Sequence, residues 1–160
     1  MIGMFGGILG SQVISSFEAE ISAIPALAFF IPLITAMGGN VGVQSSAIVV
    51  QSLARDNFMF KSTLTRIAKE VMVALTNGIL LSLLIYAISS FLEGTTLAIV
   101  VSISLFIVII FASVLGTIIP LALNKYNIDP ALATGPFVTT LNDIIGLFIY
   151  FTVGMFLYHL

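Results

Sequence analysis

Asp143 lies deep within the last apolar segment of the chain and is the side chain there best suited to carry chemistry. It follows Pro130 by 13 residues, roughly 20 Å along a helix that begins at that proline. An ionised carboxylate at the centre of a bilayer costs at least about 2.5–3.5 kcal/mol, so it must face a polar interior or a cation. Thr139, Gly146 and Tyr150 would lie on its helix face. This pattern favours a cation pathway; the alternative is a protonated or hydrogen-bonded carboxyl used only in helix packing.

The second apolar segment carries a glycine-rich stretch with two amide side chains, Met37-Gly-Gly-Asn-Val-Gly-Val-Gln-Ser-Ser46. Adjacent Gly38 and Gly39 weaken a helix, while Asn40 and Gln44 are four residues apart and share one face. Such residues are costly inside a membrane span unless they line a wet path. Close helix packing is the alternative interpretation. No lysine follows the glycines, so the stretch does not indicate a phosphate-binding loop.

The last apolar segment has a marked beginning at Asp129-Pro130, a good N-cap followed by proline at the first helical position. Pro136 lies further along and leaves the carbonyl of Leu132 without its helical donor. We therefore expect a kink at Gly135-Pro136, one to two turns before Asp143. The freed carbonyls could form a stepping site for a hydrated cation, or the kink could be purely structural.

The composition places the chain among membrane proteins. Of its 160 residues 59% are hydrophobic and only 8% are charged, too few to keep a soluble surface in water. Strand-like alternation is absent, and backbone groups in lipid must be paired within each segment, so the spans are helices. We predict an all-α membrane protein, a single transmembrane pore domain over residues 1–160 with no soluble regulatory domain. Its five helices are expected at about 1–17, 24–54, 64–91, 95–124 and 129–159.

Three further features of the sequence add expectations. The first run measures about 26 Å, slightly short for a span, so its helix should begin upstream of this chain. The chain has no cysteine, which excludes thiolate metal sites and a cysteine nucleophile. Pro25-Ala-Leu-Ala28 and Pro130-Ala-Leu-Ala133 open the second and fifth segments, as inverted repeats would, although four apolar residues are a weak signal.

The distribution of charge predicts the orientation in the membrane. All five Lys and Arg residues fall in or beside the second and fourth connections: Arg55, Lys61, Arg66, Lys69 and Lys125. The positive-inside rule then places these connections and the N-terminus in the cytoplasm and the C-terminus outside. We expect a multi-pass protein of the cell membrane that does not bind nucleic acid. Glu18 and Glu20 could concentrate cations at an outer entrance or could simply be solvated, while His159 is expected to be a passive tail.

Four stretches carry the distinctive residues: Ala28-Phe-Phe-Ile-Pro32, Met37–Ser46, Asp129-Pro-Ala-Leu-Ala-Thr-Gly-Pro136 and Thr139-Thr-Leu-Asn-Asp-Ile-Ile-Gly-Leu-Phe-Ile-Tyr150. Together they resemble the membrane domain of the MgtE family of magnesium transporters, over essentially the whole chain. The resemblance implies a homodimer whose pore is lined by the second and fifth helices of both subunits. It also implies cytoplasmic regulatory domains in full-length members, which are not among these residues.

The resemblance assigns the metal site to Asp143, which would bind a hydrated magnesium ion. It also assigns backbone contacts to the glycine-rich stretch. Val43, Ala47 and Thr139 differ from the residues of some members, which leaves direct contacts by these side chains open. The residues expected to line or support the pathway are Gly38, Gly39, Asn40, Gln44, Gly135, Thr139 and Gly146.

Physical chemistry fits this expectation. Mg²⁺ dehydrates reluctantly and is usually held by one or two carboxylates while it keeps its waters. A two-fold axis beside Asp143 would bring together two carboxylates, which repel unless a divalent cation lies between them. The transported ion is therefore expected to be Mg²⁺, with Mn²⁺, Co²⁺ or Ca²⁺ not excluded.

Three other functions are weighed against a magnesium channel. A divalent-cation exchanger coupled to H⁺ or Na⁺ would require a counter-ion gradient. A non-conducting assembly subunit would not need Asp143. An intramembrane aspartyl protease needs two catalytic carboxylates, and this chain offers one buried aspartate, so we do not expect an enzyme.

Overall fold

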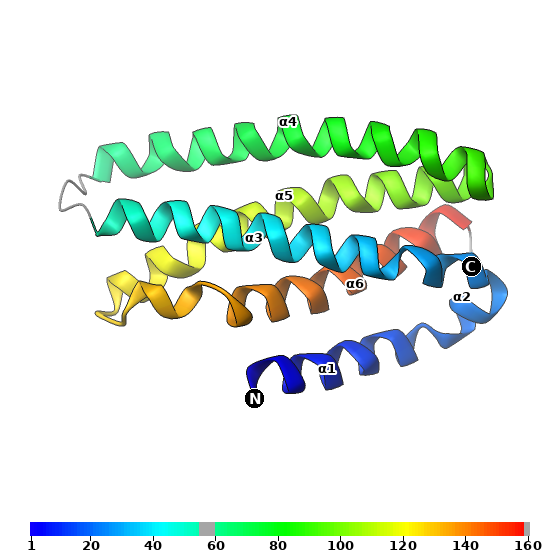
Figure 1. Ribbon diagram of the computed structural model, residues 1–160, viewed down its shortest axis with the longest axis horizontal. Helices are drawn as coiled ribbons and strands as arrows, with labels where there is room; N and C mark the ends of the chain where they lie inside the picture. The colour runs from blue at the N-terminus through cyan, green and yellow to red at the C-terminus, as the bar shows by residue number, and fades with distance from the viewer. Residues whose placement is uncertain (55–59, 159–160) are drawn as a thin grey trace.

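The computed structural model describes residues 1–54 and 60–158, and these residues are helical throughout, apart from turns and short connections (Figure 1). Arg55, Asp56 and His159 lie outside the described residues, as do the side chains of Lys61 and Arg66. The elements are α1 Ile2–Ser16, α2 Glu18–Ala23, the 3₁₀ helix η1 Pro25–Phe30, α3 Ile31–Leu53, α4 Phe60–Glu93, α5 Thr95–Lys125, the 3₁₀ helix η2 Pro130–Ala133 and α6 Pro136–Tyr158.

Four stretches within the described residues are long and apolar enough to cross a membrane: Pro25–Leu53, Ile67–Glu93, Thr95–Lys125 and Pro136–Tyr158. The all-α membrane class is thus confirmed. Helix α1 is apolar but has only 15 residues, about 22 Å, against a hydrocarbon core of about 30 Å. The fifth full span expected at 1–17 therefore stays a prediction.

Helix α5 lies at the centre of the bundle and packs against α3, α4 and α6 (Figure 1). In its most apolar window 61% of the residues are buried, compared with 11% for α4, which lies outside and packs on α5. Helix α1 packs on α6 at the opposite edge of the bundle (Figure 1). Exposed Ile99, Ile103, Ile107 and Phe111 recur every four residues along α5 and give it one outward stripe.

The start of the last span differs from the expected kinked helix over 129–159. The side chain of Asp129 caps η2 as predicted, accepting a 2.9 Å hydrogen bond from the Ala131 N–H. Thr134 is then extended, Gly135 has φ +74°, and α6 begins anew at Pro136. Glycine accepts this left-handed conformation, and proline disfavours helical geometry in the residue before it. The chain therefore breaks here instead of bending.

The two Pro-Ala-Leu-Ala stretches have the same local structure. Each begins a 3₁₀ helix with proline near its first position, η1 before α3 and η2 before α6. Each short helix thus precedes one of the two long helices that the sequence placed beside the pathway. The inverted repeat itself stays a prediction.

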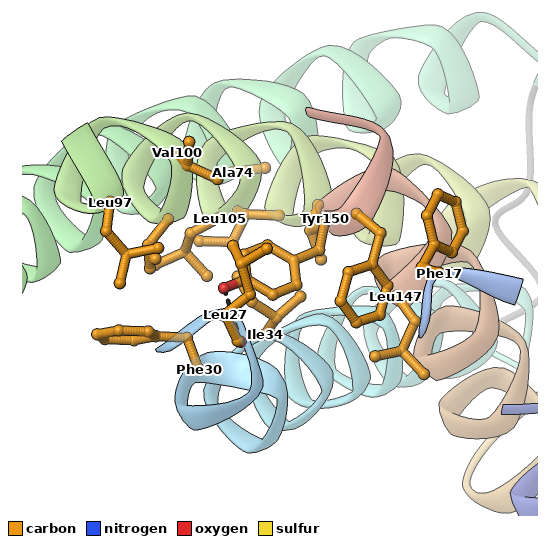
Figure 2. Close-up of a cluster of buried hydrophobic side chains, with 14 residues drawn as sticks. Phe17, Leu27, Phe30, Ile34, Ala74, Leu97, Val100, Leu105, Leu147 and Tyr150 are labelled. Carbon is orange, nitrogen blue, oxygen red and sulfur yellow. Dashed lines mark hydrogen bonds between the residues drawn. The ribbon is translucent and has the colours of Figure 1, made fainter. Parts of the chain in front are cut away.

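A cluster of buried apolar side chains joins η1, α3, α5 and the C-terminal half of α6 (Figure 2). Tyr150 is fully buried in it and donates a 2.9 Å hydrogen bond to the Leu27 carbonyl. Phe17, from the turn after α1, stacks on Phe151 with ring centroids 5.1 Å apart. The sequence places Tyr150 on the helix face of Asp143, but in the structure its ring and hydroxyl are both used in the core.

Candidate cation site

An open cleft of about 750 Å³ lies between α1, α3 and α6, and Asp143 is the acidic residue in its wall. Asp143 is partly exposed, so its carboxylate reaches the space of the cleft. The lining from α6 and the residue before it comprises Gly135, Pro136, Thr139, Thr140, Asp143 and Leu147. A carboxylate thus borders a wide cavity within a span, as an ion pathway would require.

Helix α3 approaches Asp143 at Gly39. The Asp143 Oδ1 atom lies 3.4 Å from the place that a Cβ atom would occupy on Gly39. The Thr139 Cγ2 atom lies 3.0 Å from the same point. Because a side chain at position 39 would press on Thr139 and fill the space beside Asp143, this glycine leaves the backbone of α3 next to the carboxylate.

Thr139 and Gly135 form a turn next to the cleft. The Gly135 carbonyl accepts hydrogen bonds from both the N–H and the hydroxyl of Thr139, each 3.1 Å long. The Thr139 hydroxyl thus uses its proton locally and keeps lone pairs that can accept a hydrogen bond from water. The predicted proximity of Gly135 and Thr139 to Asp143 is present in the structure.

The other glycines of α3 pack closely against neighbouring helices. A Cβ atom on Gly38 would lie 2.9 Å from Val108 Cγ1 of α5. A Cβ atom on Gly42 would collide with the Asn142 amide of α6, and one on Gly116 of α5 would collide with the Gly42 carbonyl. Gly38 and Gly42 therefore match the packing interpretation, whereas Gly39 borders the carboxylate.

Besides Gly38, three further residues expected beside the pathway do not line the cleft. Asn40 is exposed, and Gln44 lines a separate pocket of about 70 Å³ that also contains Glu70 and Asn77. Gly146 is buried, with Val108 and Ile34 as the nearest side chains to its added Cβ.

Helix α1 is a wall of the cleft that the sequence reasoning missed. It contributes Gly3, Gly6, Gly7, Gly10, Ser11 and Ile14. Gly6 packs against Thr140, whereas a Cβ atom on Gly3 or Gly7 would meet nothing within 4 Å. The spacing of these glycines, three or four residues apart, was visible in the sequence and indicated a side-chain-free helix face.

The four long apolar helices of the described residues define a polytopic helical membrane protein, and the open cleft that contains the Asp143 carboxylate is its candidate ion pathway. Residues 31–153 match the MgtE family, described as a divalent cation transporter. The chain belongs to this family.

Three curated relatives, each named magnesium transporter MgtE, are similar to nearly the whole chain. The Bacillus subtilis protein is 39% identical over 157 residues, which cover 98% of this chain and 35% of the relative. The proteins of Thermus thermophilus and Enterococcus faecalis are each 34% identical over 152 residues, which cover 94% of this chain and 34% of the relative. The chain thus spans about a third of the length of these relatives.

Proposed function

We propose that this chain conducts hydrated Mg²⁺ across the cell membrane, with Asp143 as the carboxylate that holds the ion. The observation that carries the proposal is the position of Asp143, in the wall of a 750 Å³ cleft and against the backbone of α3 at Gly39. Membership of a divalent cation transporter family and the name of the relatives support the same ion. The proposed role is transport and not catalysis.

The site would hold the ion mainly through water. No group of three or more His, Cys, Asp or Glu side chains suited to a metal occurs among the residues that the structure describes. Mg²⁺ usually keeps several waters and needs one or two carboxylates. Asp143 would accept hydrogen bonds from those waters, and Thr139 and the Gly39 backbone would supply further polar contacts beside it.

A second copy of the chain would complete the site. One carboxylate balances only half the charge of Mg²⁺, and a two-fold axis beside the cleft would supply another Asp143. Helices α3 and α6 of both subunits would then surround the pathway. Asn40, exposed on α3, would be available to face that partner. The N-terminus would lie in the cytoplasm and the C-terminus outside.

The proposal is tested by growth of magnesium-transport-deficient cells that express the protein. We expect wild type and Glu93→Gln to restore growth and Asp143→Ala to fail at equal membrane expression. Glu93 is a suitable control because it is exposed at the α4–α5 connection, outside the cleft. Rescue by Asp143→Ala would contradict the proposal and favour a non-conducting role. Rescue that depends on an imposed H⁺ or Na⁺ gradient would favour an exchanger.

A further inference from the structure

Asn142, the residue before Asp143, carries a buried amide that packing alone does not explain. It is only 3% exposed, and its Nδ2 atom has no hydrogen-bond partner among residues 1–54 and 60–158. A buried donor without an acceptor is unfavourable, and an apolar side chain of similar size would avoid the loss. Its presence beside the proposed ion site therefore calls for another role.

The amide of Asn142 is directed at the glycine-rich segment of α3. Asn142 Cγ lies 3.0 Å from the place of a Cβ atom on Gly42, and Nδ2 lies closer still. The backbone carbonyl oxygen of Asn142 lies 3.8 Å from the corresponding point on Gly38. Asn142 thus lies against the face of α3 that these two glycines leave without side chains.

All three glycines of α3, which lower the stability of a helix, lie in the same segment. Gly38 and Gly39 are adjacent and Gly42 follows one turn later, and paired small residues of this kind are common sites of helix bending. In a regular α-helix the Gly42 N–H donates to the Gly38 carbonyl. A bend at the glycines would break that bond, and in a membrane the freed carbonyl needs another donor.

We propose that Asn142 is a positioning residue that stabilises an opened form of α3. In that form its Nδ2 donates to a backbone carbonyl released within Gly38–Gly42. Because Asp143 lies against Gly39, the opening changes the width of the cleft at the carboxylate and thereby the passage of the ion. This inference rests on the proposed transport function. Discontinuous helices with satisfied backbone groups at a membrane ion site are a known physical solution to the same problem.

The test combines backbone hydrogen exchange with Mg²⁺ flux in the full chain reconstituted in lipid. Asn142→Leu keeps the number of side-chain heavy atoms and removes the donor. We expect it to slow exchange of the amides of residues 38–46 at least tenfold and to lower flux at least tenfold, with an unchanged or higher melting temperature. Ser104→Ala is the matched control, because the Ser104 hydroxyl is also fully buried and unpaired among the described residues. It should leave exchange in 38–46 and flux unchanged.

A second pair of variants guards against misfolding of Asn142→Leu. Asn142→Ser and Asn142→Ala have similar size and differ in the donor, so the serine variant should keep several-fold more flux and faster exchange. If all Asn142 variants have the same flux and the same exchange in residues 38–46 as wild type, the proposal is overturned. If Asp143→Asn still abolishes flux in that case, the transport function stands. If Asp143→Asn retains flux, the transport function fails, and exchange in 38–46 alone decides the role of Asn142.

Discussion

Gly39 and Thr139 set how closely α3 and α6 approach at the carboxylate. A methyl group on residue 39 would lie 3.0 Å from Thr139 Cγ2, so the threonine would have to move by a few tenths of an ångström beside the carboxylate. We predict that Gly39→Ala lowers Mg²⁺ flux at least fivefold. Thr139→Ser removes the obstructing methyl and keeps the hydroxyl, so the double variant should recover most of the flux.

The control for this pair is Thr139→Ser alone, which should conduct nearly as wild type. Radiotracer or fluorescent-indicator uptake into vesicles would measure all three variants. A double variant no better than Gly39→Ala would show that crowding against Thr139 is not the cause of the loss.

Tyr150 contributes to stability rather than to the pathway. Its hydroxyl donates to the Leu27 carbonyl inside the apolar cluster, so Tyr150→Phe leaves that carbonyl without its side-chain donor. We predict a loss of about 1 kcal/mol, seen as a lower melting temperature with unchanged flux below it. Tyr126→Phe is the control, because Tyr126 is 72% exposed and should not alter the melting temperature. A flux defect in Tyr150→Phe at low temperature would contradict this assignment.

Sequence reasoning singled out Asp143 but not Asn142, because a carboxylate in a membrane span is far more costly than an amide. A carboxylate in a membrane span is costly in every orientation except one facing a polar space, so its presence alone indicates a site. An asparagine is tolerated both in a packed interior and along a wet path. The sequence therefore does not distinguish these two cases, and only the structure separates the exposed Asn40 on α3 from the buried Asn142 on α6.

Helix α1 is the element whose role in the pathway is most directly testable. The chain has no cysteine, so Gly7→Cys would introduce a single thiol into the cleft, where nothing lies within 4 Å of the added Cβ. We predict that a methanethiosulfonate reagent lowers flux of Gly7→Cys several-fold and that Mg²⁺ slows the modification. Ile8→Cys on the same helix lies outside the cleft lining and should be insensitive. Equal inhibition of both variants would exclude α1 as a wall of the pathway.

At the scale of elements, sequence predicted the long spans better than their arrangement. A membrane span needs about 20 apolar residues with internally paired backbone groups. The span predicted at 95–124 therefore agrees closely with the observed helix α5, Thr95–Lys125. The central position of α5 was not predictable, because a helix apolar on all sides gives no sign of which side faces lipid. The break at Thr134–Gly135 was expected as a kink, since Pro136 permits either outcome.

The whole molecule should cross the membrane with α4–α5 and α5–α6 connections on opposite sides. This follows from the single helix α5 between them, and the positive-inside rule places the Lys125 side in the cytoplasm. We predict that Glu93→Cys is labelled by an impermeant thiol reagent from outside intact cells. Tyr126→Cys, also exposed, should be labelled only after the cells are opened. The reverse pattern would invert the proposed orientation.

The proposed dimeric pore cannot be seen in a single copy of the chain. The cleft beside Asp143 is open, and the acidic residue in its wall is one carboxylate, so the proposed pairing of charge would depend on a second subunit. Sequence resemblance, and not periodicity, predicted that pairing. Composition indicates the membrane class, but nothing in hydropathy states how two bundles meet.

Mg²⁺ uptake by purified protein in liposomes tests the central claim most directly, with wild type, Asp143→Asn and Glu93→Gln compared at equal reconstitution. Asp143→Asn keeps the size of the side chain and removes its charge. We predict that it lowers uptake at least a hundredfold while Glu93→Gln conducts as wild type. Uptake by Asp143→Asn at the wild-type rate would contradict the assignment of Asp143 as the residue that holds the ion.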